Sequence, residues 1–266
     1  MARPVIALLT DFGSRDHYAG TVKGVMLGIC PDASCVDITH EVPAHDVLAG
    51  ALELAASYKF FPPGTVFLVV VDPGVGSSRR PIAAEAGPYR FVAPDNGVLT
   101  VVFDEAAPRR VVELTERRYA RPTVSRTFEG RDRFGPAAAW LARGIDLGAL
   151  GRAVTSWHRL AVPDPVVTDN EVVAEVLRVD RFGNLVTNLA RRTFERFAEA
   201  GPFEIVAGAQ SVRKVIGTYA DAEPGAVCAM FGSSDHLEIA VNGGSAAEQL
   251  ALGRGARIAI SRVRAL

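Results

Sequence analysis

Apolar runs alternate with helical patterns in the first half of the chain. Residues 5–9 and 67–71 are continuous apolar runs, and each leads into an acid followed by glycine. An uninterrupted run of this kind is typical of a strand buried on both faces, as in a parallel sheet covered by helices. Residues 18–29 and 46–58 have helical spacing, and Asp46 is a suitable N-cap for the second helix. The alternation predicts an α/β domain with a mostly parallel central sheet.

The pattern changes after residue 155. Residues 156–170 contain prolines and few periodic apolar positions, so we expect a linker there. Short apolar segments separated by turn residues then follow at 171–179, 185–189, 203–206, 212–216, 226–231, 237–241 and 257–263. This spacing is typical of a small all-β sandwich or barrel. The sequence therefore predicts an N-terminal α/β domain over residues 1–155 and a smaller C-terminal β-barrel domain over residues 171–266.

The remaining part of the first domain is less regular. Residues 81–86 and 89–93 read as strands, residues 98–103 as a helix or a strand, and residues 136–143 as a helix. Before that helix, Glu129, Arg131, Asp132 and Arg133 lie close together between apolar flanks. A solvated loop is the default interpretation of such a charged segment, and part of an active site is the alternative.

Composition narrows the class of protein. The chain has 266 residues, 48% hydrophobic content and a formal net charge of −1, which gives no reason to expect a nucleic acid or an anionic membrane as partner. The odd number of cysteines, Cys30, Cys35 and Cys228, and their spacing argue against a disulfide framework and a zinc site. With no stretch long enough to span a membrane and no signal-peptide pattern, we expect a cytoplasmic protein.

Candidate chemistry lies where the two buried strands end. Asp11 follows the first apolar run and Asp72 follows the second, and ligands of parallel sheets bind at the carboxyl ends of strands. Gly74 and Gly76 allow a tight turn or a close approach to a ligand. An ordinary turn at Asp72-Pro-Gly74 is an equally good interpretation of this segment taken singly.

Several motifs together resemble the S-adenosylmethionine (SAM) hydroxide adenosyltransferases, relatives of the fluorinases and chlorinases. The motifs follow the family's order along nearly the whole chain: Leu9-Thr-Asp-Phe-Gly13, Asp37-Ile-Thr-His-Glu-Val-Pro43, Val70-Val-Asp-Pro-Gly-Val-Gly76, Ala93-Pro-Asp-Asn-Gly97, Thr127-Phe-Glu-Gly-Arg-Asp132, Asp180-Arg-Phe-Gly-Asn184 and Leu237-Glu-Ile-Ala-Val-Asn242. The resemblance implies an N-terminal α/β domain and a C-terminal β-barrel. It also implies a homotrimer that holds its small-molecule substrate, SAM, at subunit interfaces, with no further cofactor and no metal.

The resemblance also implies binding residues. Asp11 resembles the acid that accepts hydrogen bonds from both ribose hydroxyls, and His45 lies at a position beside the ribose. Asp180 and Asn184 resemble a pair near the methionine amino group and the adenine edge. Phe182 is similar to a residue that packs on the base, and Ser233 to a serine that meets the methionine carboxylate. For His45 or Asp180 taken singly, a surface loop residue is the alternative.

The catalytic residues match only in part. Asp72 and Arg79 fit the Asp, Arg and His set of the hydrolysing relatives, but Glu129 stands where a histidine is expected. We expect hydrolysis of SAM to adenosine and L-methionine, with Asp72 and Arg79 orienting water and Glu129 accepting its proton. A SAM- or adenosine-binding protein without turnover remains an alternative. A halogenase is a weaker one, since two carboxylates beside a halide add like charges.

Overall fold

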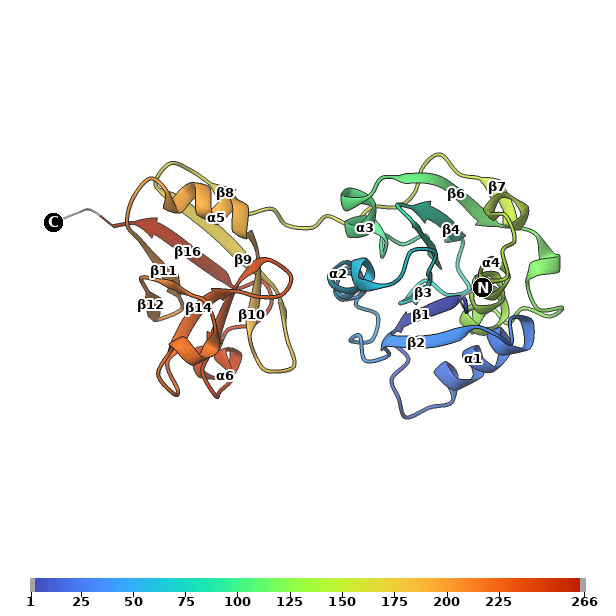
Figure 1. Ribbon diagram of the computed structural model, residues 1–266, viewed down its shortest axis with the longest axis horizontal. Coiled ribbons are helices and arrows are strands. Elements are labelled where there is room, and N and C mark those ends of the chain that lie inside the picture. Colours follow the sequence, from blue (N-terminus) through green and yellow to red (C-terminus); the bar gives the residue numbers. More distant parts are fainter. Residues whose placement is uncertain (1–2, 264–266) are drawn as a thin grey trace. The chain divides into compact units, whose positions relative to one another are not determined.

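The computed structural model describes residues 3–263, and the chain divides between Ala161 and Val162 into two compact units (Figure 1). The first unit runs from blue to green in Figure 1 and the second from yellow to red. The division falls inside the segment 156–170. Within that segment, Trp157 packs on Phe103 of the first unit, whereas Val166–Val167 pairs with a strand of the second.

The N-terminal unit is built from strands β1 (Val5–Thr10), β2 (Ser34–Thr39), β3 (Val66–Val70), β4 (Pro81–Ala86), β5 (Tyr89–Pro94), β6 (Pro108–Leu114) and β7 (Gly151–Ala153), and from helices α1 (Tyr18–Ile29), α2 (Val47–Ser57), α3 (Thr100–Glu105) and α4 (Gly135–Ala142). Short helical turns are η1 (Tyr58–Phe60), η2 (Arg117–Tyr119), η3 (Gly130–Phe134) and η4 (Leu147–Leu150). Asp46 caps α2 as predicted, since its side chain accepts a hydrogen bond from Ala49 N.

The sheet of this unit is mixed. Its order over the described residues is β2-β1-β3-β5-β4-β6-β7, in which β2, β1, β3 and β5 are parallel and the pairs from β5 to β7 are antiparallel. The antiparallel part arises because β4 and β5 are joined by a tight turn through Gly87, which has a positive φ of 55°. The parallel part is the region predicted from the apolar runs.

Helices cover both faces of this sheet. In β1, Ile6 and Leu8 are fully buried in one core cluster, together with residues of α1 and α4. Ala7 and Leu9 are fully buried in the other cluster, against α2 and α3. This alternation explains why the run is apolar throughout, because both faces of the strand are covered.

The C-terminal unit consists of β8 (Val166–Val167), β9 (Glu171–Val179), β10 (Leu185–Ala190), α5 (Arg191–Ala198), β11 (Phe203–Ala207), β12 (Gln210–Val212), β13 (Val215–Ile216), η5 (Tyr219–Asp221), β14 (Val227–Phe231), β15 (His236–Val241), α6 (Ala246–Leu250) and β16 (Arg257–Arg262). Its sheet has the order β12-β11-β16-β9-β10-β15-β14-β13, with β8 beside β9. Strand β12 also lies close to β14, so the sheet curls toward a barrel, as expected for this domain.

Some predicted elements were wrong in detail. Residues 212–216 are not one strand, because β12 and β13 pair at opposite ends of the sheet and the charged residues Arg213 and Lys214 lie between them. The open choice at residues 98–103 resolves to helix α3. The amphipathic helix α5 was missed; its Phe194 and Phe197 are buried in the barrel core.

Candidate active site

Two acids reach the same edge of the N-terminal sheet. Strands β1 and β3 are parallel neighbours, and Thr10 lies beside Val70. Asp11 therefore leaves β1 where the chain leaves β3 toward Asp72, so the two acids follow the carboxyl ends of adjacent parallel strands. This edge of the sheet is therefore where a ligand site is expected.

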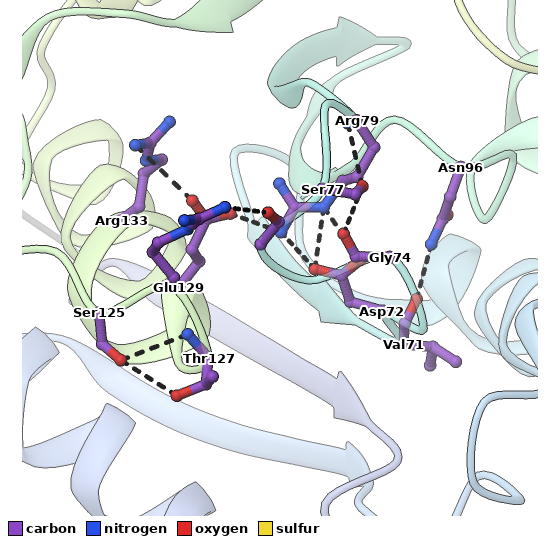
Figure 2. Close-up of polar contacts among 12 residues, drawn as sticks. Val71, Asp72, Gly74, Ser77, Arg79, Asn96, Ser125, Thr127, Glu129 and Arg133 are labelled. Atoms are coloured by element: carbon purple, nitrogen blue, oxygen red, sulfur yellow. Dashed lines mark hydrogen bonds and ion pairs between the residues drawn. The ribbon is translucent and has the colours of Figure 1, made fainter.

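The loop after β3 holds Asp72 against Arg79. Arg79 Nε donates to both carboxylate oxygens of Asp72 at 2.9 and 3.0 Å, and Nη2 donates to Oδ2 at 2.5 Å (Figure 2). The loop is fixed internally, because Ser77 Oγ donates to Gly74 O at 2.6 Å and accepts from Arg79 N at 3.2 Å. Gly76 has φ 77°, and a Cβ there would lie 2.5 Å from the carbonyl oxygen of Arg126. Glycine is therefore required at this position.

Glu129 joins the same guanidinium. Its Oε2 lies 2.5 Å from Arg79 Nη2, and Figure 2 shows Arg79 between the carboxylates of Asp72 and Glu129. The side chains of Asp72, Arg79 and Glu129 are only 5%, 9% and 12% exposed, and we call them the Arg79 cluster. The guanidinium also packs over the Phe134 ring, 5.2 Å from its centroid. Asp72 and Arg79 come from one loop, which includes a turn closed by Val75 N and Asp72 O, whereas Glu129 comes from a distant segment, so the cluster is a tertiary arrangement.

The charged segment 129–133 is not a solvated loop, so the default interpretation of this segment from the sequence was wrong. Glu129 precedes the π-helical turn η3, and Asp132 within that turn is fully buried. Arg131 Nε donates to Asp132 Oδ1 at 2.6 Å, and Ser125 N donates to Oδ2 at 2.9 Å. The hydrogen bond from Arg131 lowers the pKa of Asp132 more than burial raises it. The turn that follows Glu129 therefore contains a buried acid that is paired with Arg131 and Ser125.

The Arg79 cluster sets two carboxylates against one guanidinium. Burial works against the charge on Arg79, but the hydrogen bonds and charges of Asp72 and Glu129 outweigh it and raise the pKa of the guanidinium. Arg133 Nη2 lies 3.6 Å from Glu129 Oε1, a looser contact than the one on Oε2. Arg79 thus remains a cation, and any proton acceptor in the cluster must be a carboxylate. Glu129 Oε1 has the weaker protein contact, whereas Arg79 binds both oxygens of Asp72.

Asp11 and His45 lie at the same sheet edge. His45 N donates to Asp11 Oδ2 at 2.9 Å, and His45 has a positive φ of 69°. Non-glycine residues with positive φ are uncommon and are often retained at functional sites. The two residues are therefore neighbours, and their contact uses the backbone of His45.

The predicted residues of the C-terminal unit form a second cluster. Asp180 Oδ1 accepts from Phe182 N and Asn184 N, both at 2.9 Å, and Asn184 Nδ2 donates to Asp180 Oδ2 at 2.8 Å. Asn184 Nδ2 also approaches the hydroxyl of Tyr219 at 3.2 Å. Asp180 thus shapes the 180–184 turn, and it is not simply a surface loop residue.

A pocket of about 500 Å³ lies beside this turn. It is lined by Phe182, Asn184, Tyr219, Val241, Gly243 and Gly244. Phe182 is 75% exposed, so its side chain is not part of the core of this unit. Tyr219 was missed from the sequence. Burial, followed by the charges of Glu238 and Asp180, raises the pKa of its phenol.

Ser233 lies in the turn between β14 and β15 and is exposed. The neighbouring Ser234 differs, because its Oγ is buried and has no hydrogen-bond partner among the described residues. The turn therefore offers an exposed hydroxyl at Ser233 and a buried hydroxyl one residue further on. Ser233 was identified from the family resemblance alone, and none of the seven quoted motifs contains it.

The comparisons with known proteins bear on these two clusters. Residues 6–151 match the SAM hydroxide adenosyltransferase N-terminal domain, and residues 174–259 match its C-terminal domain. The chain belongs to the SAM hydroxide adenosyltransferase family. All nine predicted site residues lie within these two matched ranges, although His45, Arg79 and Ser233 lie outside the seven quoted motifs.

Relatives of the family match along nearly the whole chain. The (R)-S-adenosyl-L-methionine hydrolases of Salinispora tropica and Thermus thermophilus are 38% and 39% identical, and each covers at least 95% of both chains. A solved structure of an uncharacterized conserved protein from Thermotoga maritima superposes with a TM-score of 0.91 at 38% identity, covering 97% of this chain and all of that one. Fluorinases match at 26–31% identity.

No group of three or more His, Cys, Asp or Glu side chains within residues 3–263 is arranged to hold a metal ion. None of the helices in the same range has the length and apolar character needed to cross a membrane.

Proposed function

We propose that this chain hydrolyses S-adenosyl-L-methionine to adenosine and L-methionine. The observation that carries the proposal is the Arg79 cluster, a buried pair of carboxylates on one guanidinium at the ligand-binding edge of the sheet. Membership of the SAM hydroxide adenosyltransferase family, and the names of the relatives from Salinispora tropica and Thermus thermophilus, support SAM as the substrate.

The reaction is a displacement at the ribose C5′ carbon. The oxygen of a water molecule bonds to C5′ while the C5′–S bond breaks, and the electron pair of that bond goes to the sulfonium sulfur. Methionine leaves as a neutral thioether, so the leaving group needs no acid. Catalysis then depends on placing one water opposite the sulfur and on removing its proton.

Within the Arg79 cluster we assign separate roles to the two acids. Asp72 is bound through both oxygens by Arg79, so together they orient the water. Glu129 accepts the proton through Oε1, whose protein contact is a loose one at 3.6 Å. Its charge also favours the cationic substrate over the neutral products.

We assign substrate binding to residues of both units. Asp11 accepts hydrogen bonds from the ribose hydroxyls, with His45 beside the ribose. In the C-terminal unit, Phe182 packs on adenine, Asp180 and Asn184 contact the adenine edge and the methionine amino group, and Ser233 meets the methionine carboxylate. Each unit carries only part of this set, and the resemblance of the motifs to the family supports the homotrimer with sites at subunit interfaces that we propose. We also propose a cytoplasmic location, consistent with free Cys30, Cys35 and Cys228.

Product analysis tests the proposal. Purified protein is incubated with SAM, with and without a chelator, and the products are measured by mass spectrometry. We expect adenosine and methionine in equal amounts and no effect of the chelator. Absence of adenosine with retained SAM binding would instead support a binding protein. A second incubation with chloride or fluoride tests halide transfer, which two carboxylates beside the nucleophile disfavour.

A further inference from the structure

A chain of four polar side chains lies beneath the Asp11 turn. Thr10 Oγ1 lies 2.8 Å from His40 Nδ1, and His40 Nε2 lies 3.0 Å from Asp37 Oδ1. The other oxygen of Asp37 accepts from Lys23 Nζ at 2.5 Å. The chain links β1, the segment after β2, β2 itself and α1. We call these four residues the His40 network.

The contacts of the His40 network fix which nitrogen of the ring faces which partner. His40 Nε2 is buried 3.0 Å from Asp37 Oδ1, close to this carboxylate but outside hydrogen-bond geometry. With the Nε2 proton toward the carboxylate, Nδ1 of a neutral imidazole accepts from the Thr10 hydroxyl at 2.8 Å. Thr10 Oγ1 in turn accepts from the backbone N of Phe12 at 3.3 Å. Contacts on both ring nitrogens, with Thr10 at Nδ1 and Asp37 near Nε2, favour a single orientation of the imidazole.

The order Asp, His and hydroxyl is that of a nucleophilic triad, but accessibility excludes this role. Thr10 is only 1% exposed, and the His40 side chain is 11% exposed. A buried hydroxyl that already accepts from a backbone N–H cannot approach a substrate carbon. The network therefore acts on the protein backbone and not on a substrate.

The backbone it acts on carries Asp11. The segment that begins at His40 crosses the end of β1, because Gly13 N donates to His40 O at 2.7 Å and Val42 N donates to Thr10 O at 3.4 Å. The same segment ends at His45, whose N donates to Asp11 Oδ2 at 2.9 Å. Residues on both sides of Asp11, and the Asp11 carboxylate itself, are thus tied to one segment that His40 anchors.

We propose that His40 is a positioning residue for substrate binding: together with Thr10 and Asp37 it fixes the turn that presents Asp11 to the ribose hydroxyls of the adenosyl group. This inference rests on the proposed function, since it takes the adenosyl ribose as the ligand of Asp11. A loose turn would still bind the base but would lose the two-point contact of one carboxylate with two hydroxyls.

Affinity for two nucleosides separates this role from a general loss of structure. Adenosine and 2′,3′-dideoxyadenosine are titrated by calorimetry into the full chain, its His40→Leu and His40→Asn variants, and the control His158→Leu, which changes an exposed histidine. We expect the wild type to prefer adenosine. His40→Leu should reduce that preference about ten-fold, with little change in affinity for the dideoxy analogue.

The other variants sharpen the test. His40→Asn retains an acceptor near the position of Nδ1 and should recover part of the preference, and His158→Leu should retain all of it. In an Asp11→Ala background, His40→Leu should cause no further loss, because both changes remove the same contact. A His40→Leu variant that keeps the wild-type preference, or that loses affinity for both nucleosides equally, would overturn the inference. A wild-type protein that binds neither nucleoside would overturn the proposed function itself.

Discussion

The substitution Glu129→Gln tests the assignment of the proton acceptor. Glutamine keeps the shape of the side chain, and its amide oxygen can still accept from Arg79 Nη2, the contact that lies at 2.5 Å in the wild type. The amide nitrogen that replaces Oε1, which faces Arg133 and the attacking water, however, does not take up a proton. Loss of a general base lowers the rate by roughly 10²–10⁴-fold, which corresponds to about 3–5 kcal/mol in the barrier.

Substrate affinity should change much less. Glu129 contributes one of two carboxylates on Arg79, and loss of one charge near a cationic substrate costs about 1–2 kcal/mol, or roughly 5–30-fold in Kd. The assay is single-turnover formation of adenosine, with SAM binding measured separately by calorimetry. Glu116→Gln is the matched control, because Glu116 is exposed and has no side-chain capping contact. We expect the control to behave as the wild type.

The substitution Glu129→His separates two hypotheses about Glu129, because they predict opposite changes in activity. If Glu129 is the base, Glu129→His should lower activity, because imidazole replaces the carboxylate that pairs with Arg79. Higher activity in Glu129→His would mean that Glu129 only occupies the place of a lost catalytic group. High wild-type activity that is unchanged in Glu129→Gln would refute the reasoning in both forms and would point to Asp72 as the acceptor.

Three further predictions concern the loop, the buried acid and the two units. Gly76→Ala should lower kcat at least about ten-fold and destabilise the fold by roughly 1–3 kcal/mol, because the added Cβ meets the backbone oxygen of Arg126. The control is Gly20→Ala in α1, where an added Cβ has no neighbouring atom within 4 Å. It should be neutral or stabilising in the same thermal and kinetic assays. Asp132→Asn should lower the free energy of unfolding at pH 7 by about 2–4 kcal/mol. The pKa of Asp132 is lowered in the fold, so its contribution to the free energy of unfolding is present above the ordinary carboxyl pKa of about 4 and disappears as the pH falls through its pKa in the folded protein. Denaturant titrations of the wild type and Asp132→Asn should therefore converge in acid. A difference that stays constant with pH would contradict this. A truncated chain ending at Ala161 should show cooperative unfolding but no measurable SAM binding by calorimetry, and wild-type affinity in it would contradict the proposed role of the C-terminal unit.

The positions of Asp11 and Asp72 could be predicted because they depend on strand order alone. An apolar run covered on both faces indicates a parallel strand, and the ends of neighbouring parallel strands share an edge. The N-cap at Asp46 was predictable for a similar reason, since capping is local chemistry. The direction of β4 relative to β5 depended on one tight turn, and it made the sheet mixed.

The burial of Glu129 could not be predicted from its neighbours in the chain. Local charge density indicates solvent, whereas the partner that makes burial possible, Arg79, comes from a loop after a different strand. Tyr219 was missed for the same physical reason. Its contact with Asn184 depends on the curl of the barrel, which brings a short turn beside β10, and no periodic pattern marks it.

The most direct test of the proposed reaction follows the oxygen of the water. SAM is converted by the wild-type protein in H₂¹⁸O, and adenosine and methionine are analysed by mass spectrometry. Attack of water at C5′ predicts one ¹⁸O atom in adenosine, in the 5′-hydroxyl, and none in methionine. Label in the amino-acid product, or no turnover of SAM, would contradict the proposal that Glu129 and the Arg79 cluster activate water at C5′.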